Sequence, residues 1–203
     1  MGVAGILLAA GDGSRLGQPK ATVLLDGSTL AERGAELLRA GGAGPVIVVT
    51  GAVPVEIPGV LTVHNPDWVT GMGSSLAAGL GALTSAGIGA AGIGAAVIAL
   101  ADQPLVGAEA VRRLIAAHSG GAAVAVAAYD GKPRNPVLIA RAHWPAVIGL
   151  AVGDTGARPF LRARQDLVTL VECGDTGSPD DVDTPEDLAR VRAVSRDRSQ
   201  EGS

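Results

Sequence analysis

The sequence contains few aromatic residues, one cysteine and no strong excess of either charge. Among its 203 residues, in which alanine and glycine are abundant, the aromatic ones are Trp68, Tyr129, Trp144 and Phe160. We therefore expect a close-packed aliphatic core. The single cysteine, Cys173, excludes an internal disulfide and fits a reducing compartment. A net charge of −4 argues against nucleic acid as the main partner, because a phosphate backbone is bound by concentrated Lys and Arg.

Long hydrophobic runs are also absent. No charged residue occurs between Asp67 and Asp102, yet glycine, serine and threonine interrupt this stretch before about 20 strongly apolar residues accumulate. The apolar start has no basic region or cleavage-like site, which indicates a first strand rather than a signal peptide. We therefore expect a cytoplasmic protein without a membrane segment. Within the uncharged stretch AGIGA occurs twice, at 86–90 and 91–95, and we interpret this as a local duplication in a loop.

Short apolar runs alternate with helical patterns along the chain. Strands are expected within residues 3–9, 24–25, 45–51, 60–66, 95–102, 123–129, 132–140 and 167–172. Helices are expected between Thr29 and Gly41, from Ser74, over 107–118, near 143–150 and from Thr184. This alternation predicts a three-layer, Rossmann-like α/β fold with a mostly parallel sheet, in which residues 132–140 form a hairpin with the strand before them. No linker divides the chain, so we expect a single domain over residues 1–195, followed by a disordered polar tail over 196–203.

A glycine-rich loop follows the first expected strand, in the stretch ILLAAGDGSRLGQPK. Its spacing from Gly11 is G-x-G-x-x-x-G, which differs from the dinucleotide fingerprint G-x-G-x-x-G, and the second strand ends without an acid for a ribose. A Walker A loop is excluded because Leu16 and Gln18 stand where its second glycine would be. The small residues at the strand end let backbone N–H groups approach a ligand, and Arg15 and Lys20 add two cations. Backbone donors and paired cations favour a polyphosphate ligand over a solvated loop without function.

These residues resemble the opening motif of nucleotidyltransferases, L-A-A-G-x-x-x-R-[LM]-G-x-x-K. Five later stretches resemble, in the same order, molybdopterin cytidylyltransferases and the wider molybdopterin-nucleotide transferase family: NPDWVTGMGSSLAAGL (65–80), LADQP (100–104), RNPVLI (134–139), GDTGAR (153–158) and DVDTPEDL (181–188). The resemblance covers almost the whole chain. It implies the nucleotidyltransferase version of the Rossmann-like sandwich, a CTP-dependent transfer of CMP to molybdopterin with release of pyrophosphate, and Mg²⁺ as cofactor. It also implies a molybdoenzyme client as a protein partner.

Roles for individual residues follow from their positions and from this resemblance. Asp102 ends an apolar strand, where open α/β sheets bind ligands, and is expected to hold Mg²⁺, although an aspartate there also commonly caps a helix. Asp183 is the second expected metal ligand, or else an acid that only flanks the Thr184 cap, and Asp180 and Asp181 are given less weight. The expected catalytic residues are Arg15, Lys20 and Asp102. The expected nucleotide-binding residues are Leu8, Ala9, Ala10, Gly11, Arg15, Lys20, Gly71, Ser75 and Asp102. The expected acceptor-binding residues are Arg134, Asn135 and Arg158.

The identity of the base and the class of activity remain open between alternatives. In the related enzymes the alanine found here as Ala10 accompanies pyrimidine nucleotides, whereas glycine accompanies guanine, so the resemblance favours CTP over GTP. Because aromatic residues are scarce, we expect backbone edges and small polar groups to recognise the base. One alternative is an oxidoreductase of the nicotine blue reductase type on the same fold. Another is a non-catalytic module that binds a nucleotide or cofactor for delivery to a partner enzyme.

Overall fold

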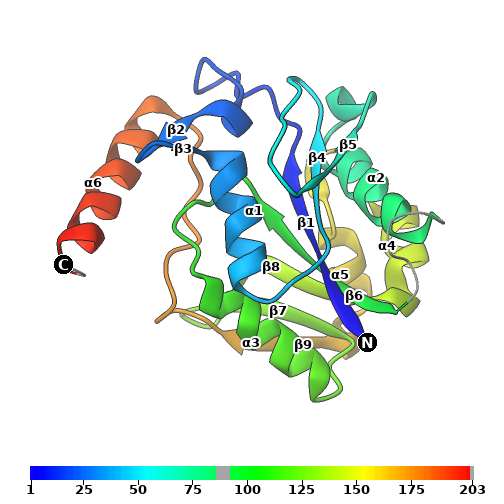
Figure 1. Cartoon of the computed structure of the whole chain (residues 1–203). Helices are drawn as coiled ribbons and strands as arrows, with labels where there is room; N and C mark the ends of the chain where they lie inside the picture. The colour runs from blue at the N-terminus through cyan, green and yellow to red at the C-terminus, as the bar shows by residue number, and fades with distance from the viewer. Residues whose placement is uncertain (86–91, 202–203) are drawn as a thin grey trace.

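The computed structural model describes residues 1–85 and 92–201, and a seven-stranded sheet with helices on both faces forms its centre (Figure 1). The strand order is β5-β4-β1-β6-β8-β7-β9. The strands are β1 (Gly2–Ala9), β4 (Val46–Thr50), β5 (Leu61–His64), β6 (Ile93–Leu100), β7 (Val124–Tyr129), β8 (Lys132–Ala140) and β9 (Val168–Glu172). The α-helices are α1 (Leu30–Ala40), α2 (Met72–Thr84), α3 (Ala108–Ser119), α4 (Trp144–Leu150), α5 (Arg158–Ala163) and α6 (Pro185–Glu201). The predicted three-layer α/β architecture is confirmed.

The sheet is mostly parallel, as the alternating pattern predicts. Strand β8 pairs antiparallel with both β6 and β7, whereas β1, β4, β5 and β6 pair in parallel, as do β7 and β9. The predicted turn before β8 is present, because Asp130 and Gly131 both have positive φ, at 53° and 71°. A second tight turn, with Asp26 at φ 49° and Gly27 at φ 85°, joins the two-residue strands β2 (Leu24–Leu25) and β3 (Ser28–Thr29).

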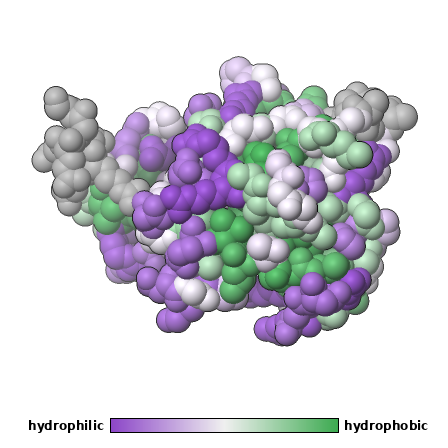
Figure 2. Space-filling model, turned by 90° about the horizontal axis from the view of Figure 1, so that it is seen from below, coloured by the Kyte–Doolittle hydropathy of each residue, from purple (hydrophilic) through white to green (hydrophobic). Residues whose placement is uncertain are grey.

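Two aliphatic cores lie on the two faces of the sheet. Helices α1 and α3 pack over one face, and α2, α4 and α5 pack over the other (Figure 1). Glycines allow this close approach to β1: a Cβ on Gly34 of α1 would lie 2.5 Å from Leu7 Cδ1, and a Cβ on Gly79 of α2 would lie 2.8 Å from Ile6 Cγ2. Seen from below the view of Figure 1, the surface carries interspersed hydrophobic and hydrophilic side chains (Figure 2).

Helix starts follow the expected capping residues, with one shift. Thr29 and Glu32 form the predicted capping box at α1. At α6, Thr184 and Asp187 cap each other, since each backbone N–H donates to the other's side chain at 3.0 and 3.2 Å. Helix α2 begins at Met72 instead of Ser74, so the serines of the TGMGSS motif lie inside its first turn.

A third apolar cluster brings the last helix to the opening loop. Leu16 and Val23, which flank the glycine loop, pack with Leu188 and Val191 of α6. Helix α6 continues to Glu201, through residues 196–201 where we expect a disordered tail, because this segment contains no glycine or proline that would end the helix. The first AGIGA copy lies outside the described residues, whereas Ile93–Ala95 of the second copy begin strand β6, so the expectation of a loop is wrong for this part. No helix in the described ranges is long and apolar enough to cross a membrane.

Candidate active site

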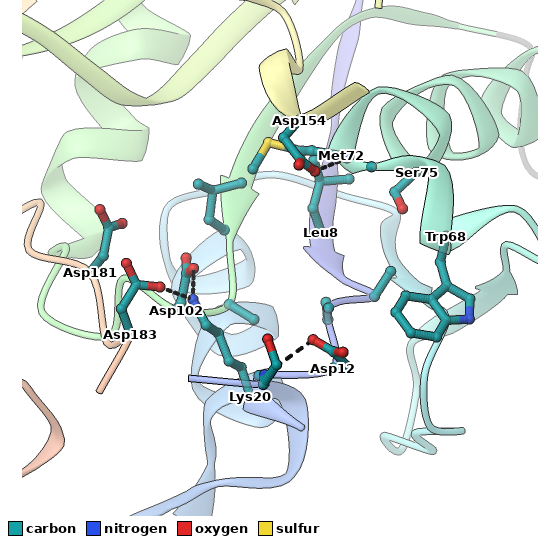
Figure 3. A pocket seen from close by; sticks show the side chains of 18 of the residues that line it. Leu8, Asp12, Lys20, Trp68, Met72, Ser75, Asp102, Asp154, Asp181 and Asp183 are labelled. Carbon is teal, nitrogen blue, oxygen red and sulfur yellow. Dashed lines mark hydrogen bonds and ion pairs between the residues drawn. The ribbon is translucent and has the colours of Figure 1, made fainter. Parts of the chain in front are cut away.

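The candidate site lies at the carboxyl ends of the neighbouring strands β1 and β6, in a cavity of about 670 Å³ (Figure 3). Strand β1 leads through α1 to β4 on one side, whereas β6 pairs with it on the other side. The order of the strands therefore reverses between β1 and β6, and open α/β sheets bind ligands at such a point. Backbone bonds continue the sheet into the cavity wall, since Ala101 N donates to Leu8 O at 3.1 Å and Ala52 N donates to Ala10 O at 3.0 Å.

The glycine loop is folded on itself beside the cavity. Gly13 has φ 63°, and a Cβ on it would lie 2.0 Å from Gln18 O, so this position accepts glycine alone. The carbonyl of Gly13 accepts bonds from Leu16 N and Gly17 N at 2.8 and 2.9 Å. A Cβ on Gly11, in contrast, would meet no atom within 4 Å. The side of the loop at Gly11 is therefore open.

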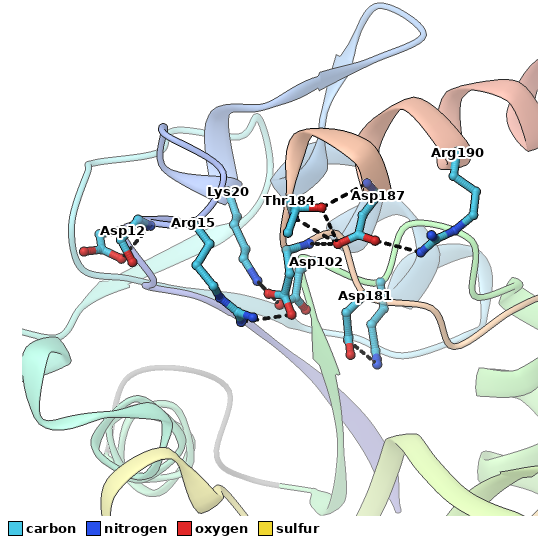
Figure 4. Close-up of polar contacts among 11 residues, drawn as sticks. Asp12, Arg15, Lys20, Asp102, Asp181, Thr184, Asp187 and Arg190 are labelled. Carbon is cyan, nitrogen blue, oxygen red and sulfur yellow. Dashed lines mark hydrogen bonds and ion pairs between the residues drawn. The ribbon is translucent and has the colours of Figure 1, made fainter.

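A cluster of two cations and two carboxylates occupies one half of the cavity (Figure 4). Lys20 is the first residue of the short 3-10 helix η1 (Lys20–Thr22), and its Nζ lies 2.7 Å from Asp102 Oδ2. The same ammonium also donates to Asp183 Oδ1. Arg15 Nη2 lies 3.0 Å from the other oxygen of Asp183. Lys20 and the two acids are largely covered, with 19%, 20% and 27% of their side chains exposed, whereas Arg15 is 71% exposed.

The electrostatics of the cluster stabilise its charged form. Burial lowers the pKa of Lys20, but the charges and hydrogen bonds of Asp102 and Asp183 outweigh burial, so this pKa lies above its usual value. The hydrogen bond from Lys20 holds the pKa of Asp183 below its usual value. One oxygen of Asp102, Oδ1, is buried and has no hydrogen-bond partner among the described residues. The cluster thus already holds one cation between two carboxylates and leaves an acceptor oxygen unused.

The structure distinguishes between the two roles considered for Asp102 and Asp183, which are capping a helix and facing the cavity. Helix α3 has Gly107 as its N-cap, so Asp102 does not cap it. The backbone N–H of Asp183 donates to Asp187 at 3.2 Å as part of the α6 cap, while its carboxylate contacts Lys20 and Arg15. Both acids therefore face the cavity. Arg15 and Lys20, which we expect to neutralise a polyphosphate, pair with these two acids in the structure.

The other half of the cavity is formed by the end of β1 and the start of α2 (Figure 3). Ser75 is buried and accepts a hydrogen bond from Asn65 Nδ2 at 3.0 Å. The expected nucleotide-binding residues that line the cavity are Leu8, Ala9, Ala10, Gly11, Arg15, Lys20, Gly71, Ser75 and Asp102. The cavity thus gathers the whole expected set from segments far apart in the sequence.

Three further lining residues were missed by sequence reasoning or given little weight there. Trp68, an aromatic side chain outside the apolar cores, lines the cavity, and Gly51 leaves room for it, since a Cβ on Gly51 would lie 2.5 Å from Trp68 Cγ. Asp154 accepts a bond from Met72 N at 3.3 Å and so caps α2. Asp181 lines the cavity beside Asp102, and burial raises its pKa. Each occurs in a stretch that carries the resemblance, which is the signal that could have found them.

A second cavity, of about 1130 Å³, adjoins the first. It is lined by all three residues expected on the acceptor side, Arg134 and Asn135 from β8 and Arg158 from α5. Its lining also includes the cations Lys132 and Arg162 and the apolar side chains Leu161 and Leu170. The geometry therefore offers two adjoining compartments, one beside a loop of backbone donors and one with several cations.

Comparisons with known proteins give a family match and several relatives of similar fold. Residues 5–168 match the family model of the MobA-like NTP transferase domain. The nicotine blue oxidoreductase of Paenarthrobacter nicotinovorans is 38% identical, over 93% of this chain and 96% of that protein. The Rv0371c homologue from Mycobacterium sp. strain JC1 is 30% identical, with a TM-score of 0.79 over 95% of this chain and 96% of the other. Rv0371c of Mycobacterium tuberculosis H37Rv in complex with manganese is 22% identical, with a TM-score of 0.75 over 95% of this chain and 99% of the other.

The match to the family model covers most of the chain, and the strand order and layers are those of the Rossmann-like nucleotidyltransferase fold. The protein belongs to the MobA-like NTP transferase domain family.

Proposed function

We propose that the protein transfers CMP from CTP to molybdopterin and releases pyrophosphate. The observation that carries this proposal is the first cavity, in which the open side of the glycine loop, Lys20 and Asp102 meet. The adjoining cavity, with Arg134 and Asn135 in its wall, suits an anionic acceptor such as a pterin phosphate.

The reaction is a displacement at phosphorus. An oxygen of the acceptor phosphate attacks the α-phosphorus of CTP, and the bond from this phosphorus to the bridging oxygen of the β-phosphate breaks with its electron pair on pyrophosphate. No general base is required, because the acceptor phosphate is already ionised at neutral pH. Catalysis then consists of positioning and charge neutralisation. Backbone N–H groups near Gly11 hold the phosphates, while Arg15 and Lys20 neutralise the leaving pyrophosphate.

The acids of the cavity fit a divalent cation. Asp102 and Asp183 already hold the ammonium of Lys20 between them, and the second oxygen of Asp102 is buried without a partner in the described part of the chain. No group of three or more His, Cys, Asp or Glu suited to a metal occurs among the described residues, so the remaining ligands would be phosphate oxygens and water, as Mg²⁺ prefers. When bound, Mg²⁺ would neutralise charge on the phosphates. The related Rv0371c was solved in complex with manganese, which supports a divalent cation as the cofactor.

CTP is the proposed nucleotide because of Ala10. This residue lines the cavity at the end of β1, and alanine at this place accompanies pyrimidine nucleotides in the related enzymes. Thermal unfolding measured with each of the four NTPs and Mg²⁺ tests this choice, because a ligand that binds the native state alone raises the melting temperature. We expect the largest increase with CTP. A preference for GTP, or no response to any NTP, contradicts it.

Transfer itself is tested by measuring pyrophosphate and the molybdopterin cytosine dinucleotide formed from CTP, Mg²⁺ and molybdopterin. We expect Asp102→Asn to lower turnover about 10²–10³-fold, the scale of removing a preorganised charge. The control is Glu36→Gln, an exposed acid on α1 outside both cavities. Turnover by Asp102→Asn near that of the wild type refutes the role of Asp102. Binding of CTP without turnover by the wild type indicates a module that only binds nucleotides.

A second candidate function is the reduction of a nicotine blue-type pigment. The 38% identity to a nicotine blue oxidoreductase favours it. Such an activity would take a hydride from NAD(P)H and a proton from solvent, whereas this chain lacks the G-x-G-x-x-G fingerprint after β1. Oxidation of NAD(P)H that depends on the pigment, in the absence of CTP, would establish this function instead.

A further inference from the structure

The two cavities share a boundary formed by a few residues. Leu100, Arg158 and Asp181 line both cavities. Leu100 is apolar and ends β6, Asp181 precedes α6, and Arg158 begins α5. A group that passes from a ligand in one cavity to a ligand in the other must cross this boundary, where Arg158 supplies the positive charge.

Arg158 differs from the other two cations of the first cavity, because none of the described residues pairs with its side chain. Arg15 and Lys20 are paired with Asp102 and Asp183. The guanidinium of Arg158 makes no hydrogen bond or ion pair with any part of the chain that the structure describes, and the residue is exposed. Its five N–H donors are therefore available to oxygen atoms of a ligand.

The backbone before Arg158 is fixed to the wall of the first cavity. Asp154 accepts a bond from Met72 N at 3.3 Å. Gly71 has φ 112°, and a Cβ on it would lie 2.4 Å from the carbonyl carbon of Gly153, so the start of α2 and the segment before Arg158 are in close contact. An arginine whose side chain is free and whose backbone is anchored to the nucleotide cavity is suited to contact a phosphoryl group.

The acid at the boundary, Asp181, is engaged by a hydrogen bond from another residue of the chain. Asp181 accepts a bond from Gln103 Nε2 at 2.9 Å, and Gln103 also donates to Pro179 O at 3.0 Å.

We propose that Arg158 contacts the phosphoryl group while it is transferred, binding the α-phosphate of the nucleotide from one cavity and the incoming acceptor oxygen from the other. This inference rests on the proposed function and assigns Arg158 a catalytic role in addition to acceptor binding. As the acceptor oxygen bonds to the α-phosphorus and pyrophosphate departs, the oxygens that remain on phosphorus face the guanidinium. The contact is present in the nucleotide complex and strengthens during transfer, so its loss lowers kcat more than it weakens substrate binding.

Arg162 provides the matched comparison. It lies one turn after Arg158 on α5 and lines the second cavity without lining the first. We expect Arg158→Gln to lower kcat about 10²-fold, the scale of removing one preorganised donor, and Arg158→Lys to recover part of this loss. We expect Arg162→Gln to raise KM for molybdopterin more than it lowers kcat. Arg158→Gln with the kcat of the wild type, or with the same pattern as Arg162→Gln, overturns the inference.

Calorimetry of CTP and Mg²⁺ without acceptor separates this inference from the proposed function. We expect Arg158→Gln to bind CTP several-fold more weakly than the wild type and to bind cytidine equally well. If the wild type binds CTP but transfers nothing, the proposed function fails, and the CTP measurement still decides whether Arg158 contacts the phosphates. Equal CTP affinities of wild type and Arg158→Gln contradict the contact.

Discussion

Replacing Lys20 by methionine should make the protein bind a divalent cation more tightly in the absence of nucleotide. The Lys20 ammonium donates to both Asp102 and Asp183, so a metal ion that uses these acids must displace it. A hydrogen bond between charged groups contributes about 1.5–3 kcal/mol, and about 1.4 kcal/mol corresponds to a tenfold change in affinity. Removing the competing cation should therefore lower the dissociation constant for Mn²⁺ at least about tenfold, even if only one of the two bonds must break.

The assay is a titration with Mn²⁺ followed by electron paramagnetic resonance, which measures free and bound ion directly. Lys132→Met is the matched control, because this lysine lines the second cavity and has no ion pair among the described residues. Without metal, Lys20→Met should also unfold at lower urea concentration, since Asp102 and Asp183 lose their shared partner, and Mn²⁺ should restore stability. Unchanged or weaker Mn²⁺ binding by Lys20→Met would show that the acids do not form a cation site.

Three further predictions concern stability. Gly13→Ala should lower the free energy of unfolding by more than about 1 kcal/mol, because φ is 63° there and the new Cβ would lie 2.0 Å from Gln18 O. The control is Gly17→Ala, whose Cβ would meet no atom within 4 Å, and it should lower the free energy of unfolding less in the same urea titration. Thr29→Ala should lower the free energy of unfolding by about 1 kcal/mol through loss of the α1 capping box, and a loss below the error of urea titration would contradict this. The pKa of Asp183 is held below its usual 3.8 by Lys20, so the stability that this carboxylate contributes is complete above pH 3.8 and is lost as the pH falls through the lowered pKa. The stability difference between wild type and Asp183→Asn should accordingly be constant near neutral pH and shrink below pH 3.8, and a difference that grows in acid would contradict the sign.

Much of the fold could be predicted because its signals are local. The Asp26-Gly27 and Asp130-Gly131 turns have the positive φ angles that these residues tolerate. The cap at Thr29 fixes the start of α1. Helix α5 was missed because its six residues are too few to show a helical period, and buried Phe160 anchors it. The placement of β8 between β6 and β7 depends on long-range pairing, which one sequence does not show.

The candidate site was predictable as a set of residues but not as an arrangement. The motifs brought Lys20, Asp102 and Asp183 into one list, and strand ends explained why Asp102 faces a crevice. The pairing of Lys20 with Asp183 depends on the apolar cluster that packs α6 against the opening loop, and this cluster joins residues more than 150 positions apart, such as Leu16 and Leu188. Trp68 was overlooked because the scarcity of aromatic residues led us to expect recognition of the base by backbone edges and small polar groups.

The central claim is that the cavity at the ends of β1 and β6 binds a nucleoside triphosphate. The most direct measurement is a crystal structure of the protein with CTP and Mg²⁺. The account predicts that the triphosphate lies against the open side of Gly11, with Lys20 moved from Asp102 to a phosphate oxygen and the metal on Asp102. A nucleotide bound outside this cavity, or phosphates that leave the pair of Lys20 and Asp102 intact, would contradict it.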